Sequence, residues 1–252
     1  MSEFKGKSVL ITGASEGIGR ATAKAFAAQG ANLILVARNL KRLQSLVNEL
    51  KPLQKQFKSK YSVHQLDLQD AKAVDIFFKK IKLLDFAINN AGVEGKISEI
   101  QALTLKDYHD VFDINVRALF QCLQHEVSFF RKHACPGAIV NVSSILGLRG
   151  ISGSSLYVAS KHAVIGFTRA TAVEQIAHRI RINCISPGAT DTPMLRRVIG
   201  TENVESVGIA PGKELIKPEN IAKSITWLCS EESSRIVGHN LIVDSGRTVQ
   251  IG

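Results

Sequence analysis

The chain has 252 residues, of which 45% are hydrophobic and 21% charged, a composition that excludes a disordered or collagen-like protein. No run of about 18 apolar residues is present and the N-terminus lacks a signal-peptide pattern, so we expect no membrane anchor. The net charge of +10 admits an anionic partner, but the basic residues are scattered and no nucleic-acid motif accompanies them, which favours a solvated basic surface and no nucleic-acid partner.

The cysteines offer neither a disulfide framework nor a metal site. Cys122, Cys135, Cys184 and Cys229 form no C-x-x-C pair, and none lies near a histidine in zinc-finger spacing. We expect buried free thiols in a reducing compartment. The sequence therefore predicts a cytoplasmic protein without a metal.

Short apolar runs alternate with segments of helical periodicity along the whole chain. The predicted strands are 8–12, 32–37, 62–66, 85–89, 138–142, 182–185 and 241–243. The predicted helices are 20–29, one from residue 40 that Pro52 ends, 71–82, one from a Thr104/Asp107 capping box toward residue 132, 156–177, and one beginning at Pro218.

Seven strands separated by helices need crossover connections, which implies a parallel sheet with helices on both faces. No linker rich in proline, glycine or serine divides the chain. We therefore predict a single α/β domain over residues 1–252, with a doubly wound, Rossmann-like sheet of seven parallel strands. The weakly patterned residues 193–217 are expected to form a loop or lid over a substrate site.

A glycine-rich turn joins the first predicted strand to the first helix and reads Thr12-Gly13-Ala14-Ser15-Glu16-Gly17-Ile18-Gly19. Glycines at such a turn let the backbone approach a pyrophosphate, and the helix N-terminus supplies free N–H groups and the positive end of a dipole. Three glycines alone are a weak signal, because they also serve purely conformational needs. Their place between a strand and a helix favours a dinucleotide site.

The end of the second predicted strand distinguishes the two dinucleotides. Proteins that bind NAD place a carboxylate there for the ribose 2′-hydroxyl, whereas those that bind NADP use arginine. This strand ends in Arg38-Asn39 without a carboxylate, and a charge-assisted pair between Arg38 and a 2′-phosphate is worth about 1.5–3 kcal/mol. NADP(H) is therefore favoured, and NAD(H) remains the alternative.

Tyr157 and Lys161 stand four residues apart in a predicted helix and share one face. Tyrosine titrates near 10, so acid–base work near neutral pH needs a shift of about three units, or about 4 kcal/mol. A cation about 4 Å away contributes about that much at an effective dielectric of about 20, before desolvation opposes it. We expect Lys161 to lower the pKa of Tyr157.

Further motifs accompany this pair in a fixed order: Asn89-Asn90-Ala91-Gly92, Asn115, Ser144 thirteen residues before Tyr157, and Pro187-Gly188. With the glycine turn, they resemble the short-chain dehydrogenase/reductase family from residue 7 to about residue 246. The resemblance implies an NADP(H)-dependent oxidoreductase that interconverts a carbonyl and a secondary alcohol by hydride transfer.

The same resemblance implies roles for four residues. Tyr157 looks like the general acid or base, and Ser144 like the residue that bonds the same substrate oxygen. Lys161 would lower the pKa of Tyr157 and bind the nicotinamide ribose. Asn115 is similar to the residue that kinks its helix and holds a water, which completes a proton relay through Lys161.

The resemblance also implies the cofactor contacts. The phosphates would be surrounded by Thr12, Gly13, Ser15, Gly17, Ile18 and Gly19. Asp67 and Leu68 match positions that contact adenine, and Asn90, Ala91 and Gly92 match the segment lining the adenosine ribose. The stretch Pro187, Gly188, Thr190 and Thr192 resembles the one that binds the carboxamide and fixes which nicotinamide face meets the substrate.

Two positions depart from the family pattern. Glu16 stands where NADP-preferring members often carry a basic residue, which places more of the 2′-phosphate recognition on Arg38 and Ser15. The last strand ends Asp244-Ser245-Gly246 where the family often has Asp-Gly-Gly, and we expect this to alter a turn or an interface.

Several functions stay open at this point. A 3-oxoacyl-[acyl-carrier-protein] reductase would exploit the basic surface, and a carbonyl, sugar or steroid reductase is an equal alternative. A catalytically silent dinucleotide sensor that docks on a partner belongs to a different class. The resemblance further implies a homo-oligomer, with a tetramer favoured over a dimer, formed through the helices 107–132 and 156–177.

Overall fold

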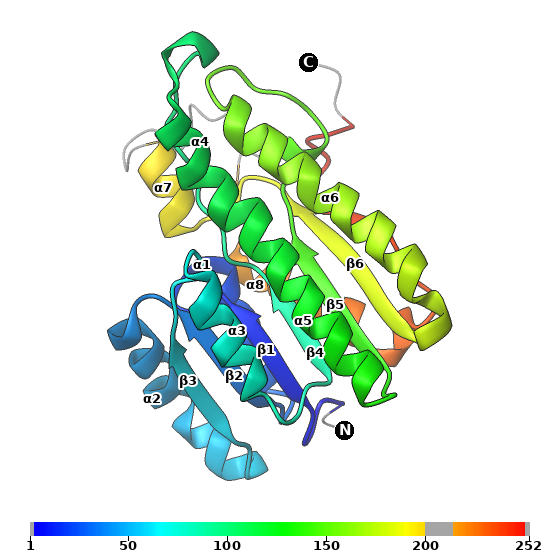
Figure 1. The fold of residues 1–252 in the computed structure, drawn as a ribbon. Helices are drawn as coiled ribbons and strands as arrows, with labels where there is room; N and C mark the ends of the chain where they lie inside the picture. Colours follow the sequence, from blue (N-terminus) through cyan, green and yellow to red (C-terminus); the bar gives the residue numbers. More distant parts are fainter. Residues whose placement is uncertain (1–2, 200–213, 250–252) are drawn as a thin grey trace.

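A computed structural model describes residues 3–199 and 214–249 (Figure 1). Within them, seven strands form one sheet in the order β3-β2-β1-β4-β5-β6-β7, and every neighbouring pair is parallel. Their bounds are β1 Ser8–Thr12, β2 Asn32–Ala37, β3 Tyr61–Gln65, β4 Phe86–Asn89, β5 Gly137–Val142, β6 Ile180–Pro187 and β7 Asn240–Val243. The predicted doubly wound α/β fold is confirmed.

Helices cover both faces of this sheet, as Figure 1 shows. One apolar layer contains residues of α1, α2 and α8, and the other contains residues of α3, α5 and α6. The helices are α1 Gly17–Ala27, α2 Leu40–Phe57, α3 Ala71–Lys79, α4 Leu105–Phe112, α5 Leu119–Lys132, α6 Ser155–Gln175, α7 Pro193–Ile199 and α8 Pro218–Cys229. No helix within the described ranges is long and apolar enough to span a bilayer.

The strands alternate between the two layers. Val9 and Ile11 of β1 pack in the layer with α1, while Leu10 packs in the opposite layer, and all three are completely buried. Because both sides of β1 are buried, its residues 9–11 form a continuous apolar run. Each such side chain contributes about 1.5–3 kcal/mol by its burial.

Pro52 does not end its helix, contrary to the prediction. It lies inside α2, which continues to Phe57. A proline inside a helix costs about 3 kcal/mol, but Leu53 packs on the core, and Phe57 lies so close to Gly30 that a Cβ there would be 3.2 Å from Cδ1 of its ring. We infer that this packing offsets the lost hydrogen bond.

The Thr104/Asp107 capping box is present, and both of its reciprocal bonds form. The helix that it opens is not continuous, however. A π-helical stretch, Asp113–Ala118, separates α4 from α5 and contains the buried Asn115. Stretches of this kind interrupt the regular ladder and often occur at functional sites.

The bounds of β1 and β2 are as predicted, and several others differ from the prediction by a few residues. The glycine turn itself begins α1 at Gly17, and β6 is longer than expected because it pairs with both β5 and β7. Helix α7 was not predicted within 193–217. Residues 200–213 of the predicted lid lie outside the described residues.

Candidate active site

Predicted site residues follow each of the six strands β1 to β6, at one edge of the sheet. Because β1, β4, β5 and β6 are parallel, their carboxyl ends meet at this edge (Figure 1). The strand order reverses between β1 and β4, and such a switch point is where open α/β sheets bind ligands.

The glycine turn is built for close backbone approach. Gly13 and Gly17 have φ angles of +65° and +54°, which favour glycine. A Cβ on Gly19 would lie 2.3 Å from the carbonyl oxygen of Gly13 and 2.5 Å from Nδ2 of Asn90. That Asn90 amide donates to the carbonyl oxygens of Thr12 and Gly13 at 3.0 and 3.2 Å, so it braces the turn.

The start of α1 fits a pyrophosphate. No side chain caps this helix, and its first turn holds no acidic residue, so its first N–H groups remain available to an anion. Ser15 and Ile18 are half-buried in the turn, and Ile18 packs on the core. These residues therefore fit the phosphates of a dinucleotide.

Residues at the ends of β1 and β4 are tied together. The Thr12 hydroxyl accepts from the backbone N–H groups of Asn90 and Ala91, at 3.0 and 3.1 Å. After β3, Leu68 is buried, while the exposed Asp67 accepts from the backbone N–H of Gln69 at 3.0 Å.

Arg38 is exposed at the end of β2, as the sequence places it. The departure at Glu16 looks different in three dimensions: its carboxylate pairs with Arg42 of α2 and lies 3.5 Å from Nη1 of Arg197 in α7. Two guanidinium groups therefore compensate its charge. Neither arginine was predicted as part of the site, although Arg42 stands only four residues after Arg38.

Asn115, Lys161 and Gly92 converge on one point. The Asn115 amide binds the backbone of Val93 through both of its atoms, at 2.8 and 2.9 Å, and donates to Ser160 at 3.0 Å. A Cβ on Gly92 would lie 3.2 Å from Oδ1 of Asn115 and 3.4 Å from Nζ of Lys161. Only glycine leaves this space open.

The predicted influence of Lys161 on Tyr157 is wrong in this arrangement. Burial raises the pKa of Tyr157 to about 12, while a hydrogen bond with Ser144 lowers it and the Glu94 carboxylate raises it further. Nζ of Lys161 lies 5.6 Å from the centre of the phenol ring and donates to the carbonyl oxygen of Val142 at 3.0 Å. Burial also lowers the pKa of Lys161 to about 8.

Ser144 lies in the segment between β5 and α6, and its Oγ accepts from the N–H of Leu146 at 3.1 Å. The neighbouring Ser143 donates to the carbonyl oxygen of Lys161 at 2.9 Å, which ties this segment to α6. A Cβ on Gly147 would lie 2.8 Å from the same carbonyl oxygen. This close packing brings Ser144 and Tyr157 together.

The stretch after β6 lies against the glycine turn. A Cβ on Gly188 would lie 2.9 Å from Cα of Asp244, so β6 and β7 end in close contact. Thr190 bridges to Ile216, and a Cβ on Gly17 would lie 3.1 Å from Cγ2 of Thr192. The structure thus brings the predicted carboxamide stretch and phosphate turn together.

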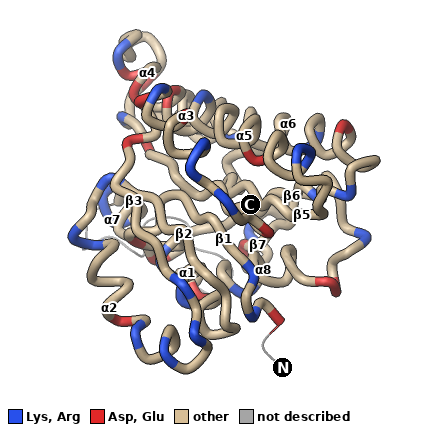
Figure 2. The backbone as a smooth tube through the Cα atoms, turned by 60° about the horizontal axis from the view of Figure 1, so that its bottom comes forward, with Lys and Arg blue, Asp and Glu red and all other residues tan. Residues whose placement is uncertain are grey.

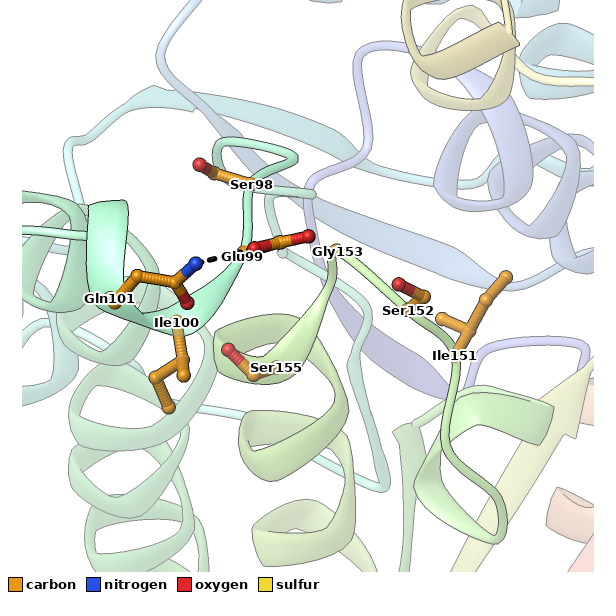
Figure 3. A pocket seen from close by; sticks show the side chains of 8 residues that line it. All are labelled: Ser98, Glu99, Ile100, Gln101, Ile151, Ser152, Gly153 and Ser155. Carbon is orange, nitrogen blue, oxygen red and sulfur yellow. Dashed lines mark hydrogen bonds between the residues drawn. The ribbon is translucent and has the colours of Figure 1, made fainter.

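The described residues border a hollow of about 390 Å³ (Figure 3). It lies between residues 98–101 and the segment that leads into α6. Its lining is mixed, with hydroxyl groups from Ser98, Ser152 and Ser155 next to Ile100 and Ile151. A cluster of His, Cys, Asp or Glu fit to hold a metal does not occur among the described residues.

Glu126 is a buried carboxyl that the sequence analysis missed. It lies beneath the site on α5 and accepts from Nδ2 of Asn89 at 2.9 Å. The same amide donates to Asn141 at 3.0 Å, and Asn141 donates to Thr168 at 2.9 Å. This polar network joins β4 and β5 to α5 and α6.

We expect Glu126 to make the stability of the fold depend on pH. Burial raises its pKa from 4.5 to about 7, so the folded chain binds a proton that the unfolded chain releases. Its contribution is complete below pH 4.5 and is lost as the pH rises through about 7, a change of about 3 kcal/mol. Urea unfolding of wild type between pH 4.5 and 8 measures this loss, and Glu126→Gln should flatten it. A Glu174→Gln control, at an exposed position of α6, should keep the wild-type slope; equal slopes in all three proteins would contradict the assignment.

Fold and site together define a dinucleotide-binding α/β protein with a serine, a tyrosine and a lysine at the binding edge. The family model described as enoyl-(acyl carrier protein) reductase matches residues 13–248. The cyclohexanol dehydrogenase of Acinetobacter sp. (strain SE19) is 35% identical over 248 residues, which cover 98% of this chain and 97% of that protein. A 3-oxoacyl-[acyl-carrier-protein] reductase of Thermotoga maritima is 33% identical, covering 98% of this chain and 99% of that protein.

Solved structures agree with these relatives. Levodione reductase superposes with a TM-score of 0.92 at 32% identity, over 98% of this chain and 100% of its own. ElxO with NADP bound gives 0.86 at 32% identity, over 97% of this chain and 100% of its own. The chain belongs to the short-chain dehydrogenase/reductase family, whose members bind NAD(P) and are oxidoreductases.

Proposed function

We propose that the chain is an NADP(H)-dependent oxidoreductase that interconverts a carbonyl and a secondary alcohol. The observation that carries this proposal is the meeting of Ser144 and Tyr157 next to Lys161, at the sheet edge that also holds the glycine turn. A protein that only binds a dinucleotide has no need of a proton donor there, so this set argues against a silent sensor.

Each member of the set has one role in the proposal. When bound, the nicotinamide supplies or accepts the hydride. Ser144 holds the substrate oxygen, and Tyr157 gives or takes its proton. Lys161, whose Nζ lies 5.6 Å from the centre of the phenol ring, would bind the nicotinamide ribose, and Asn115 holds the π-helical stretch against Val93.

The charges at the end of β2 support NADP(H) over NAD(H). No carboxylate stands at Arg38, and the nearby Glu16 is compensated by Arg42 and Arg197. A 2′-phosphate would therefore meet an exposed arginine and little net negative charge. ElxO, solved with NADP bound, is a relative at 32% identity.

Arg38→Ala should weaken NADPH binding by about tenfold or more, because a charge-assisted pair with a phosphate is lost. Binding of NADH, which lacks the 2′-phosphate, should change by less than about twofold. Titration of the cofactor fluorescence gives both dissociation constants. Lys41→Ala, an exposed change of equal charge on α2, is the control; an equal loss for both cofactors would argue against the assigned contact.

A panel of ketones and secondary alcohols, assayed with NADPH and NADH by absorbance, tests the proposed function. The hollow with hydroxyl and isoleucine side chains (Figure 3) is our candidate for the substrate body. A relative acts on cyclohexanol by its name, so alicyclic ketones belong in the panel. Cofactor binding without turnover of any member would favour the sensor instead.

A 3-oxoacyl-[acyl-carrier-protein] reductase is the second candidate, favoured by the charge of +10 and by the relative from Thermotoga maritima. Figure 2 shows lysine and arginine spread over many elements and mixed with acidic residues. A 3-oxoacyl thioester on an acidic carrier protein belongs in the same panel.

We also propose a homo-oligomer, with a tetramer favoured over a dimer, through α5 and α6. Phe120 of α5 is 43% exposed and contacts Phe167 of α6, with 5.9 Å between the ring centres. Val173 and Ile176 expose 72% and 58% along the same region. The single domain over 1–252, the lid at 193–217 and the cytoplasmic location stay predictions.

A further inference from the structure

Four charged side chains form a chain of ion pairs across the candidate site. Arg42 of α2 pairs with Glu16 of the glycine turn. Glu16 lies 3.5 Å from Nη1 of Arg197 in α7, and Nε of Arg197 lies 2.7 Å from Oε1 of Glu94, in the segment after β4. Arg197 thus joins two acidic residues that are far apart in sequence.

The contact with Glu94 is two-pronged, because Nη2 of Arg197 also donates to Oε2 at 3.4 Å. Such paired bonds between guanidinium and carboxylate fix orientation as well as distance. Glu94 is the better covered partner, with 23% of its side chain exposed. Desolvation makes this pair stronger than a fully exposed one.

A second observation places α7 against the cofactor turn independently of the charges. A Cβ on Gly17 would lie 3.1 Å from Cγ2 of Thr192 and 4.0 Å from Cδ of Pro193, the first residue of α7. The base of this segment is pinned as well, because the backbone N–H groups of Asp191 and Ile216 donate to the carbonyl oxygens of Ile216 and Ala189, each at 2.9 Å.

We propose that Arg197 is a positioning residue that holds α7 against the glycine turn by pairing with Glu16 and Glu94 at the same time. Opening of α7 then requires both pairs to break, which slows the release of a dinucleotide bound at the turn. The inference rests on the proposed function, because it assumes a cofactor at the glycine turn.

The same arrangement connects Arg197 to Tyr157. The groups that influence the pKa of the phenol are Ser144 after β5 and Glu94 after β4, whose carboxylate pairs with Arg197, while Nζ of Lys161 lies 5.6 Å from the ring centre. The Glu94 carboxylate raises the pKa of Tyr157. Loss of Arg197 should therefore raise the pKa of the phenol further, whereas loss of the Glu94 charge should lower it.

The test compares three variants by stopped-flow release of NADPH, followed by its fluorescence. Arg197→Gln, which removes both pairs, and Glu94→Gln, which removes one, should each release NADPH about three- to tenfold faster than wild type. Arg196→Gln is the matched control: the neighbouring arginine pairs with Asp191 inside its own segment, at 2.8 Å. It should stay within about twofold of wild type.

The pH profile of turnover separates this role from a merely structural one. Arg197→Gln should move the profile of the acid–base step to higher pH and Glu94→Gln to lower pH, while Arg196→Gln leaves it in place. Equal release rates in all four proteins would overturn the inference and leave the proposed function intact. Failure of wild type to bind either dinucleotide would overturn the proposed function first, and this inference with it.

Discussion

Tyr157→Phe should lower kcat by about a thousandfold while leaving the dissociation constant of NADPH within about threefold of wild type. The change removes one hydroxyl group and keeps the ring, so the packing of the half-buried side chain is preserved. The substrate oxygen that Ser144 is proposed to hold then loses its proton donor, the phenol hydroxyl. Hydride transfer without that proton leaves an alkoxide unneutralised, which is why kcat carries the loss.

Steady-state kinetics and cofactor titration measure the two quantities separately. Tyr108→Phe is the matched control, because this tyrosine is 40% exposed on α4 and stacks on Phe112, with 4.3 Å between the ring centres. The control should keep full activity. Turnover by Tyr157→Phe at the wild-type rate would remove Tyr157 as the acid or base, while leaving the dinucleotide site untouched.

Gly19→Ala should lower the free energy of unfolding by about 3 kcal/mol and abolish measurable cofactor binding. The added methyl group would lie 2.3 Å from a carbonyl oxygen of Gly13, which is backbone and has no rotamer to yield. To relieve this clash, the turn would have to move away from α1, or Asn90 would have to release the turn. Either movement changes the N–H groups that we propose for the pyrophosphate.

Urea unfolding and a cofactor titration measure the two losses. Gly150→Ala is the control, because a Cβ at Gly150 meets nothing within 4 Å. It should change the free energy of unfolding by less than about 0.5 kcal/mol. A Gly19→Ala protein with wild-type stability and affinity would show that the turn tolerates rearrangement, and would weaken its assignment as a phosphate cradle.

The sequence by itself determined the architecture, since apolar runs fully buried on both faces leave a characteristic pattern. Residues 8–12 and 32–37 were predicted to the residue, because each contains a short apolar run (9–11 and 33–37) between polar or glycine-containing segments. The site motifs were also readable, because the carboxyl ends of parallel strands meet at one edge, whatever the details of packing.

Only the tertiary structure decided features that depend on partners distant in sequence. Helix α2 continues past Pro52, against the local preference of proline, and Leu53 in this continuation packs on the core. Burial sets the protonation of Glu126, which reads as an ordinary helical carboxylate in the sequence. The orientation of the Lys161 side chain could not be predicted either, because its hydrogen bond to the carbonyl oxygen of Val142 on β5 fixes it.

The charge at Glu16 shows the same division. Along the chain it is a lone acidic residue in a phosphate-binding turn, and it argues against NADP. In the fold it meets Arg42 and Arg197, which come from two separate helices. The local sequence determines which charged residues a segment carries. The electrostatic potential at a site, however, is the sum of the charges on every segment that folding brings there.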